Sequence, residues 1–262
     1  MGASHSIADR YTVERTDAVP PDQRAYAALL HSDFREHYAR GRDVWTGEEA
    51  MRQAPRALMS ALRARTASTR AGAPGPGGSG GSVHVLDIGT GHGRDARLLL
   101  AAGHRVTGID LVASPEWEAL AARHPGRARF LATAALDLPG TAQYDAALDN
   151  GCFHHQHPGT YGPYLRRIHE LLRPGGLLTL SVFHAADGKG GLYANAGNRL
   201  YREFTEPQLT ALAAAHGFAL VAACRVPRAV GDLAYLVSTF RRAEAGGPQT
   251  GNPLRPSTGD PS

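Results

Sequence analysis

Short apolar runs alternate with amphipathic segments of helical periodicity from residue 83 to residue 240, and this alternation constrains the fold more than any other feature. Parallel strands buried on both faces read as continuous apolar runs, and VHVLDI (83–88) and LLTLSVF (177–183) have this form. The segments 218–226 and 233–240 follow one another closely and predict an antiparallel pair at one edge. The sequence therefore predicts an α/β protein with a doubly wound, mostly parallel sheet of seven strands and an antiparallel edge strand.

The chain on either side of this core differs from it in composition. Residues 1–21 lack hydrophobic periodicity and predict a flexible arm, whereas residues 22–70 show helical spacing and predict an N-terminal helical cover. The run AGAPGPGGSGGS at residues 71–82 predicts a linker, because glycine costs backbone entropy and proline removes a hydrogen-bond donor. The core domain is expected at residues 83–241. Residues 242–262 are poor in apolar side chains, which predicts a disordered tail.

Composition and charge disfavour several classes of protein. The formal charge is +4, but the basic residues are scattered and nearly all are arginine, with Lys189 the only lysine, so nucleic-acid binding is disfavoured. Cys152 and Cys224 are too few for a disulfide framework or a four-cysteine zinc site, and free thiols are expected. No apolar run approaches the roughly 18 to 20 residues of a membrane span, so a cytoplasmic location without membrane contact is expected.

A glycine-rich loop, Asp87-Ile-Gly89-Thr-Gly91-His-Gly93, joins the end of the first predicted core strand to the start of a helix. Glycines allow a sharp turn and a close approach of a ligand to the main chain, and free N–H groups at a helix start favour anionic or polar ligand groups. Asp110 ends the next strand, where a carboxylate can accept both hydroxyls of a ribose. Together these features predict a nucleoside site at the point where the strand order of the sheet reverses.

A nicotinamide dinucleotide is a less favoured ligand for this loop. The dinucleotide fingerprint G-x-G-x-x-G/A requires a small residue at position 94, and the chain has Arg94 there. A Tyr-x-x-x-Lys pair is also absent from the sequence, since Lys189 is the only lysine. An NAD(P)-dependent oxidoreductase is therefore disfavoured.

Three motifs, in the order in which they occur along the chain, resemble those of the class I S-adenosylmethionine-dependent methyltransferases. The glycine loop matches the first motif of that family, and the segments YDAALDNGCFHH (144–155) and ELLRPGGLLTLSVF (170–183) match its later blocks. The resemblance extends from Val83 to about Phe240 and implies a Rossmann-like fold with S-adenosylmethionine as the cofactor. The residues that it implies as cofactor contacts are Asp87, Gly89, Gly91, Gly93, Asp110, Leu111, Thr133, Asp149 and Asn150.

One position departs from the pattern of this family. Where the family often has an acidic residue that contacts the adenine amino group, this chain has Ala134. The resemblance leaves Thr133 or a backbone group to make that contact.

A narrower resemblance concerns the segment before the core. HYARGRDVW (37–45), combined with ALDNGCFHH, is similar to the thiopurine, thiol and tellurite methyltransferases, in which an N-terminal tyrosine and tryptophan cover the cofactor. The resemblance implies this role for Tyr38 and Trp45. A Trp45 that only joins the helices of the cover is the alternative.

Three histidines, His154, His155 and His157, follow the strand predicted at residues 144–149, at the edge where the methyl group is expected. Methyl transfer is an in-line displacement, and an alcohol or phenol acceptor needs a base, for which histidine is the usual choice. His154 and His155 are therefore the candidate catalytic residues, as base or orienting group; a hydrogen bond to a loop carbonyl is the alternative. A metal ion held by this cluster and Asp149 is disfavoured, because the spacing is not a standard one.

Substrate selection is expected in the N-terminal cover and in the connection 184–204, which is rich in glycine and asparagine. Its aromatic and amide side chains suit a planar or heterocyclic small molecule, and a surface excursion packed on the next helix is the alternative. Binding of a flipped nucleic-acid base is disfavoured, because DNGC (149–152) replaces the N/D-P-P-Y/F motif. The candidate substrate-binding residues are His157, Tyr193, Asn195, Tyr201 and Arg202.

The sequence therefore predicts an enzyme that moves a methyl group from S-adenosylmethionine to an O, N or S atom of a small molecule, such as a specialised metabolite. The alternative is a catalytically inactive regulatory protein that binds S-adenosylmethionine or a nucleotide, which Ala134 slightly favours. The acceptor atom, the substrate scaffold and the oligomeric state are not constrained by the sequence.

Overall fold

The computed structural model describes residues 13–41, 44–70, 82–229 and 233–243. The greater part of the predicted arm, linker and tail therefore lies outside the described residues. None of the described helices combines the length and the apolar character that a membrane span requires.

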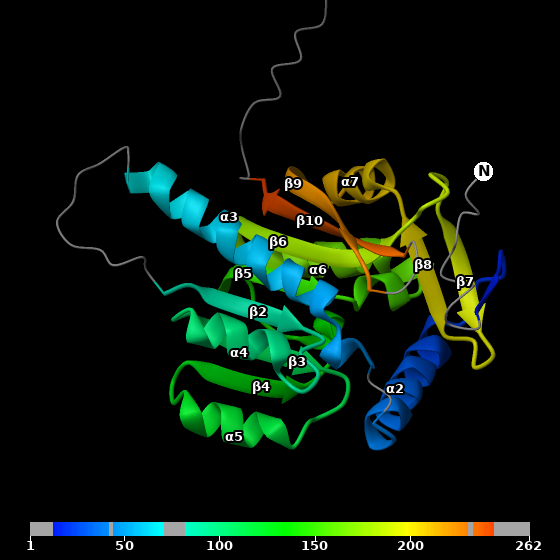
Figure 1. The fold of residues 1–262 in the computed structure, drawn as a ribbon, viewed down its shortest axis with the longest axis horizontal. Helices are drawn as coiled ribbons and strands as arrows, with labels where there is room; N and C mark the ends of the chain where they lie inside the picture. The colour runs from blue at the N-terminus through cyan, green and yellow to red at the C-terminus, as the bar shows by residue number, and fades with distance from the viewer. Residues whose placement is uncertain (1–12, 42–43, 71–81, 230–232, 244–262) are drawn as a thin grey trace, which may run out of the picture.

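The core of the fold is a sheet whose central strands run parallel (Figure 1). In order across the sheet, its strands are β4 (Ala128–Ala132), β3 (Arg105–Asp110), β2 (His84–Ile88), β5 (Tyr144–Asn150), β6 (Leu172–His184), β10 (Ala234–Arg242) and β9 (Phe218–Pro227). The first five pair in parallel, and β10 lies antiparallel between β6 and β9. These strands confirm the predicted doubly wound α/β sheet with its antiparallel edge.

Three short strands extend the sheet beyond the carboxyl end of β6. They are β1 (Val13–Arg15), β7 (Gly191–Asn195) and β8 (Leu200–Phe204). β8 pairs in parallel with β6, β7 lies antiparallel to β8, and β1 lies antiparallel to β7, so the described sheet has ten strands. The connection after β6 is therefore a hairpin. β1 corrects the prediction of an arm without structure, because the free edge of β7 offers backbone groups with which this segment pairs.

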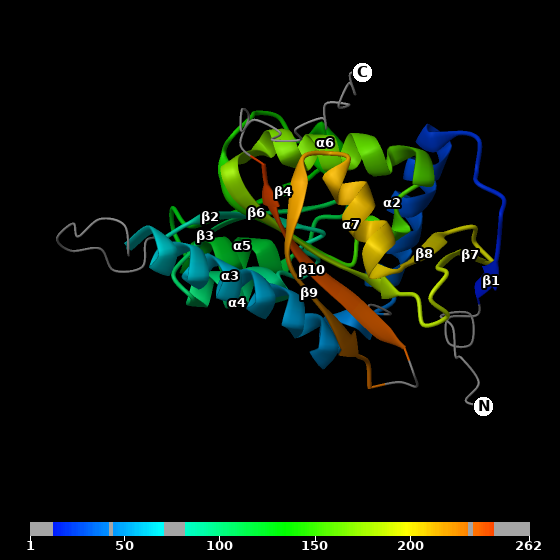
Figure 2. The ribbon, with the colours of Figure 1, turned by 90° about the horizontal axis from the view of Figure 1, so that it is seen from above.

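Helices cover both faces of this sheet (Figure 2). Side chains alternate along each strand, so that Leu86 of β2 packs into the core on one face and Val85 into the core on the other. On the Leu86 face the helices are α6 (Tyr161–Leu171) and α7 (Glu206–Ala214), and on the Val85 face they are α3 (Gln53–Arg70), α4 (Arg94–Ala101) and α5 (Glu116–Arg123).

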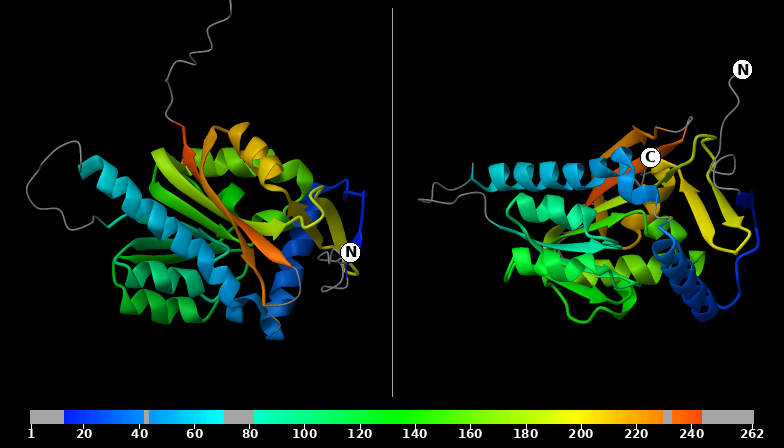
Figure 3. Two further views of the ribbon diagram at one scale, coloured as in Figure 1. Left: turned by 45° about the horizontal axis from the view of Figure 1, so that its top comes forward. Right: turned by 60° about the horizontal axis from the view of Figure 1, so that its bottom comes forward.

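The first helix of the N-terminal cover lies beyond the carboxyl ends of the central strands rather than on a face of the sheet (Figure 3). This helix, α2 (Gln23–Ala39), begins after Asp22, whose carboxylate accepts hydrogen bonds from N–H groups of the first turn. Two 3-10 turns, η1 (Val44–Gly47) and η2 (Glu49–Arg52), then lead into α3. The cover therefore closes the edge of the sheet at which open α/β folds bind their ligands.

Candidate active site

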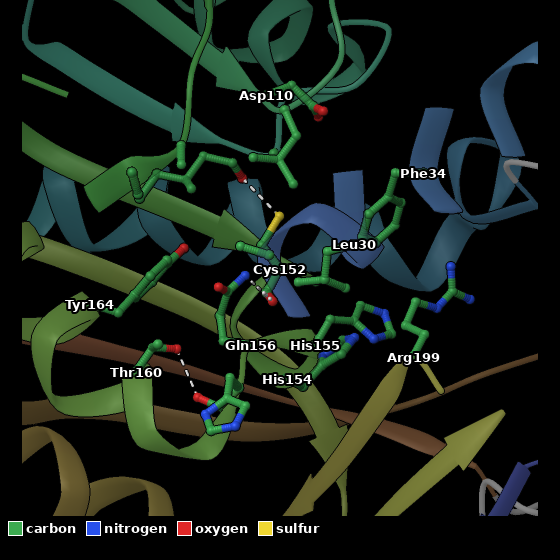
Figure 4. A pocket seen from close by; sticks show the side chains of 18 of the residues that line it. Leu30, Phe34, Asp110, Cys152, His154, His155, Gln156, Thr160, Tyr164 and Arg199 are labelled. Atoms are coloured by element: carbon green, nitrogen blue, oxygen red, sulfur yellow. Dashed lines mark hydrogen bonds between the residues drawn. The ribbon is translucent and has the colours of Figure 1, made fainter. Parts of the chain in front are cut away.

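A cavity of about 520 Å³ lies at the carboxyl ends of β2, β3 and β5, beneath the N-terminal cover. Side chains from α2, from the loop after β5 and from the start of β8 converge on it (Figure 4). The strand order reverses between β2 and β5, because β3 lies on one side of β2 and β5 lies on the other. The cavity is therefore at the switch point of the sheet, where a nucleoside site is expected.

The glycine loop brings its backbone to the wall of this cavity. Gly89 has a φ of +69°, and a Cβ at this position would lie 1.9 Å from the Sγ of Cys152. Gly91 has a φ of +52°, and its N–H donates a hydrogen bond of 2.9 Å to Oδ2 of Asp110. Gly89 lines the cavity, whereas Gly91 and Gly93 shape the loop behind it.

Asp110 lies at the end of β3 and lines the cavity. Its Oδ1 accepts a hydrogen bond of 3.0 Å from the N–H of Val112, and its Oδ2 accepts one of 3.4 Å from the hydroxyl of Tyr38. Burial raises the pKa of Asp110, and these hydrogen bonds oppose that rise. A carboxylate oxygen can accept two hydrogen bonds. Oδ2 already accepts two, from Gly91 and Tyr38, whereas Oδ1 accepts one and retains capacity for a ribose hydroxyl.

Asp87 supports the glycine loop from within the protein and does not line the cavity. Its buried Oδ2 accepts a hydrogen bond of 2.6 Å from Oγ1 of Thr90. Burial and the neighbouring Asp95 raise the pKa of Asp87. The expectation of a direct cofactor contact is therefore corrected, because the side chain of Asp87 turns inward and acts through the loop.

Asn150 ends β5 and lines the cavity, and its side chain contains a buried acceptor without a partner in the described part of the chain. Its Nδ2 donates to the backbone oxygen of Met51 at 2.7 Å and to Oδ2 of Asp95 at 2.6 Å. Its Oδ1 is buried and has no hydrogen-bond partner among the described residues. An unsatisfied buried acceptor is costly, so this oxygen is suited to a donor on a bound ligand.

Asp149 is also turned away from the cavity. Its Oδ1 accepts hydrogen bonds from the N–H groups of Cys152 at 2.8 Å and Phe153 at 3.1 Å, and its Oδ2 accepts one of 2.5 Å from the hydroxyl of Tyr164. Burial raises the pKa of Asp149 to about 6. The expected contact with the cofactor is corrected here too, because this carboxylate holds the loop after β5 in place.

The wall beside Asp110 forms the region expected to hold adenine. Leu111, Thr133 and Ala134 line it, and Oγ1 of Thr133 donates to the backbone oxygen of Ala134 at 3.4 Å. Asp137, at the end of the 3-10 turn η3 (Ala135–Asp137), lines the cavity as well. Asp137 was not among the residues predicted from the sequence, although an acidic side chain close to the altered position 134 was a usable signal.

Both aromatic residues predicted to cover the cofactor line the cavity. The rings of Tyr38 and Trp45 have centroids 6.1 Å apart, and Phe34 lies 5.9 Å from Trp45. The backbone oxygen of Trp45 accepts a hydrogen bond of 2.7 Å from Nη1 of Arg94. Trp45 therefore lines the cavity and also joins the cover to α4, so its structural role does not exclude the predicted contact with the cofactor.

His154 and His155 lie in the 3-10 turn η4 (Phe153–His155), and both line the cavity. The ring of His154 stacks on Phe183 with centroids 3.9 Å apart, and its buried Nδ1 has no hydrogen-bond partner among the described residues. Nδ1 of His155 donates to the backbone oxygen of Leu200 at 2.8 Å, which leaves Nε2 as the acceptor of a neutral ring. Burial lowers the pKa of both imidazoles, that of His155 to about 3. Both rings are therefore neutral at physiological pH.

His157 lines the cavity, but the protein engages both of its ring nitrogens. Nε2 donates to the backbone oxygen of Pro20 at 2.7 Å, and Nδ1 accepts a hydrogen bond of 3.0 Å from the N–H of Gly159. His157 therefore anchors the segment that leads into α2. Within the described ranges, no group of three or more His, Cys, Asp or Glu side chains is placed to hold a metal ion.

The β7–β8 hairpin contributes only part of the predicted substrate site. Tyr201 lines the cavity, but Tyr193, Asn195 and Arg202 do not. The hydroxyl of Tyr193 donates to Oε2 of Glu203 at 3.3 Å, and Oδ1 of Asn195 accepts a hydrogen bond within the hairpin turn. Arg202 follows Tyr201 on the strand and projects from the opposite face, because successive side chains alternate. These three assignments are therefore corrected.

Arg199, which was not among the residues predicted from the sequence, lies on the cavity wall just before β8. Its buried guanidinium pairs through Nη1 with Oδ2 of Asp33 at 2.5 Å, and its Nε donates to the hydroxyl of Tyr201 at 2.9 Å. It also lies over the ring of Phe34, 5.2 Å from the centroid. The sequence held no local signal for this role, since Asp33 is 166 positions away.

The donors and acceptors of the cavity fit S-adenosylmethionine. Asp110 can accept a ribose hydroxyl, and the orphaned Oδ1 of Asn150 can accept from an ammonium group. At Gly89 a Cβ would collide with Cys152, and the absence of a side chain there lets a ligand approach the backbone. The fold and the site thus define a nucleoside-binding α/β enzyme.

Comparison with known proteins narrows this class. The family model described as a methyltransferase domain matches residues 49–223. No curated protein matches the chain at a significant level. The chain belongs to the S-adenosylmethionine-dependent methyltransferases and acts on a small molecule. The alternative of a catalytically inactive binding protein finds no support.

Solved structures agree with this assignment. The Burkholderia thailandensis 1,6-didemethyltoxoflavin-N1-methyltransferase, with bound 1,6-didemethyltoxoflavin and S-adenosylhomocysteine, is 48% identical with a TM-score of 0.81, over 92% of this chain and 99% of that chain. A Methanosarcina mazei S-adenosylmethionine-dependent methyltransferase is 20% identical (TM-score 0.51; 62% and 93% of the two chains). The [4+2]-cyclase SpnF is 21% identical (TM-score 0.50; 63% and 76%). The last two share the fold alone.

Proposed function

We propose that this methyltransferase transfers the methyl group of S-adenosylmethionine to a ring nitrogen of 1,6-didemethyltoxoflavin or a closely similar planar heterocycle. The observation that carries this proposal is the 48% identity, over 92% of the chain, to an N1-methyltransferase crystallised with 1,6-didemethyltoxoflavin. Among the acceptor atoms that the sequence left open, this relationship favours nitrogen over oxygen and sulfur.

Aromatic rings on the cavity wall support a flat substrate. Phe34 comes from the cover, Phe183 from β6, and Tyr201 and Tyr235 from β8 and β10. Offset and edge contacts with such rings stabilise a planar ring beyond the burial of its area. Because these residues come from both the cover and the sheet, the substrate site depends on the cover being closed.

Cofactor binding is assigned to the opposite half of the cavity. Asp110 holds the ribose, Leu111 and Thr133 flank the adenine, and Oδ1 of Asn150 accepts from the methionine ammonium group. Tyr38 of the cover lies over this half of the cavity, and its hydroxyl donates a hydrogen bond of 3.4 Å to Oδ2 of Asp110. Bound S-adenosylmethionine supplies an electrophilic methyl group, so the chain itself must orient the acceptor and exclude water.

His154 and His155 are assigned to orienting the substrate. Both imidazoles line the cavity and are neutral, so each can offer an acceptor or a donor to the edge of a heterocycle. An in-line displacement needs the acceptor nitrogen held about 3 to 3.5 Å from the methyl carbon. Two fixed polar groups on one wall, opposite the cofactor half, suit this requirement.

The test is a methylation assay with the full chain. Incubation with S-adenosylmethionine and 1,6-didemethyltoxoflavin is expected to give a singly methylated product together with S-adenosylhomocysteine, both detected by mass spectrometry. A thiol, a phenol and NADH serve as comparison ligands. Methylation of the thiol or phenol without methylation of 1,6-didemethyltoxoflavin would overturn the proposal. The proposed reaction involves a free small molecule in the cytoplasm, without nucleic acid or membrane.

A further inference from the structure

Neither His154 nor His155, the two candidate catalytic histidines, has the partner that a histidine base requires. A catalytic imidazole is ordinarily oriented by a carboxylate, which also stabilises the imidazolium as it forms. His155 donates from Nδ1 to the backbone oxygen of Leu200, and the Nδ1 of His154 has no partner among the described residues. Protonation of either ring would therefore place a buried cation without a counter-ion.

The charges around these histidines also oppose their protonation. Arg199 lowers the pKa of His155, and His155, Arg228 and Arg199 lower that of His154, in each case after burial, the largest cause. Either of these two histidines, acting as a base, would have to take up a proton beside fixed cations. The proton of a ring N–H is therefore not readily passed to either histidine.

Arg199 brings a buried positive charge to the wall of the cavity. It lines the same cavity as His155, lies over Phe34, and has a side chain only 6% exposed (Figure 4). One nitrogen, Nη1, faces Asp33, and the other two face the hydroxyl of Tyr201. A guanidinium has five N–H donors, so these contacts leave donors for a substrate.

Building on the proposed function, we propose that the enzyme binds its heterocycle as the deprotonated anion, and that Arg199 is the residue that selects this form. The ring N–H loses its proton to water before binding. The lone pair of the anionic nitrogen then forms the bond to the methyl carbon, the carbon–sulfur bond breaks, and its electron pair stays on sulfur. A sulfonium and an anion thus become two neutral products, and the protein accepts no proton.

The groups that face Arg199 are compatible with this charge balance. Asp33 neutralises part of the guanidinium, and its own side chain is 23% exposed, so water shares its charge. Burial raises the pKa of Tyr26 and Tyr201, which keeps both phenols neutral. The titratable or charged groups packed around this site are Tyr26, Asp33 and His37 of α2, His155 of η4 and Tyr201 of β8.

The first arm of the test compares two titrations. The pH dependence of kcat/KM for 1,6-didemethyltoxoflavin is measured beside the spectrophotometric titration of the free compound. The rate is expected to rise with pH along the titration of the compound itself and to keep this shape in His155→Gln and His154→Gln. If kcat/KM instead rose at a pH that differs from the titration of the free compound, and this rise vanished in either histidine variant, the inference would be overturned.

The second arm measures binding, by calorimetry with S-adenosylhomocysteine present, at a pH above and a pH below the pKa of the compound. Arg199→Met is expected to weaken binding of the anion by roughly ten- to a hundredfold and binding of the neutral form much less, since a charged hydrogen bond is lost. Arg199→Lys keeps the charge and should restore most of the preference. Arg241→Met, on the exposed part of β10, is the matched control.

Asp33→Asn separates recognition of charge from a purely structural role. This variant breaks the ion pair but keeps the guanidinium, so its affinity for the anion should be retained or increased. An equal loss in Asp33→Asn and Arg199→Met would mean that the pair only holds α2 in place, and would overturn the inference. Methylation without a preference for the anion would overturn this inference alone, whereas absence of both binding and methylation at every pH would overturn the proposed function.

Discussion

Nη1 of Arg94 donates a hydrogen bond of 2.7 Å to the backbone oxygen of Trp45, and this contact ties the start of α4 to the N-terminal cover. The same guanidinium forms a bidentate ion pair with Asp95, from Nε to Oδ1 at 2.7 Å and from Nη2 to Oδ2 at 2.8 Å. Oδ2 of Asp95 also accepts from Asn150 at 2.6 Å. The cover, the helix after the glycine loop and the end of β5 therefore share one polar network beside the cavity.

Loss of Arg94 should loosen this network. Arg94→Met leaves the buried carboxylate of Asp95 without its cation, so the free energy of unfolding should fall by about 3 to 5 kcal/mol. Affinity for S-adenosylhomocysteine should fall as well, because Trp45 loses its anchor. Chemical denaturation and calorimetry measure the two effects. Arg97→Met, on the exposed side of α4, is the control, and an equal loss there would contradict the assignment.

A double variant refines this prediction. Arg94→Met combined with Asp95→Asn removes both charges, so no uncompensated ion remains buried. Part of the lost stability should return, since an unpaired charge costs more than an absent pair. A double variant that is less stable than Arg94→Met would show that Asp95 contributes through Asn150 instead.

Asp110 is expected to be the main determinant of ribose binding. Asp110→Ala should weaken binding of S-adenosylhomocysteine by more than about 1 to 2 kcal/mol, because hydrogen bonds to a charged group are lost. Burial raises the pKa of Asp110, so affinity should decline towards acid at a higher pH than an ordinary aspartate would give. Calorimetry over a pH series tests both points, with Asp187→Ala, at an exposed position that does not line the cavity, as the control. Unchanged affinity in Asp110→Ala would remove the ribose assignment.

The close contact between Gly89 and Cys152 predicts a steric effect. In Gly89→Ala the new Cβ would lie 1.9 Å from Sγ, and the residue would also keep a φ of +69°. The backbone strain alone costs about 1 to 2 kcal/mol. Gly89→Ala combined with Cys152→Ala should recover the steric part of the lost stability but not the backbone part, as thermal unfolding would show. Complete recovery would contradict the strained backbone.

The periodic parts of this molecule could be predicted from sequence, but its long-range contacts could not. Apolar runs and the glycine loop placed the seven core strands and the cavity, because a buried parallel sheet requires such runs. The direction of the Asp87 and Asp149 side chains depends on partners in their own loops, which no spacing rule gives. Arg199 was missed because its ion-pair partner Asp33 lies in another element, and the hairpin that carries Arg199 has an aromatic and amide composition shared with surface loops.

The buried imidazole of His155 is expected to make the protein less stable in acid. Its pKa in the folded protein is lowered from 6.5 to about 3, chiefly by burial. Between these two values the unfolded chain binds more protons than the folded protein, so stability rises with pH across this window. The contribution of the neutral imidazole to the free energy of unfolding is complete above about pH 6.5 and is lost as the pH falls towards 3. Its upper bound is on the order of 4 to 5 kcal/mol.

His155→Gln should flatten this part of the pH profile, because glutamine does not titrate and can still donate to the backbone oxygen of Leu200. Asp149 works in the opposite direction, since its raised pKa of about 6 makes the folded state bind the extra proton, but it is present in both proteins and cancels in the comparison. Urea denaturation at a series of pH values measures the difference. His31→Gln, at an exposed position of α2, is the control. Equal slopes in wild type and His155→Gln would mean that water reaches the imidazole in the folded protein.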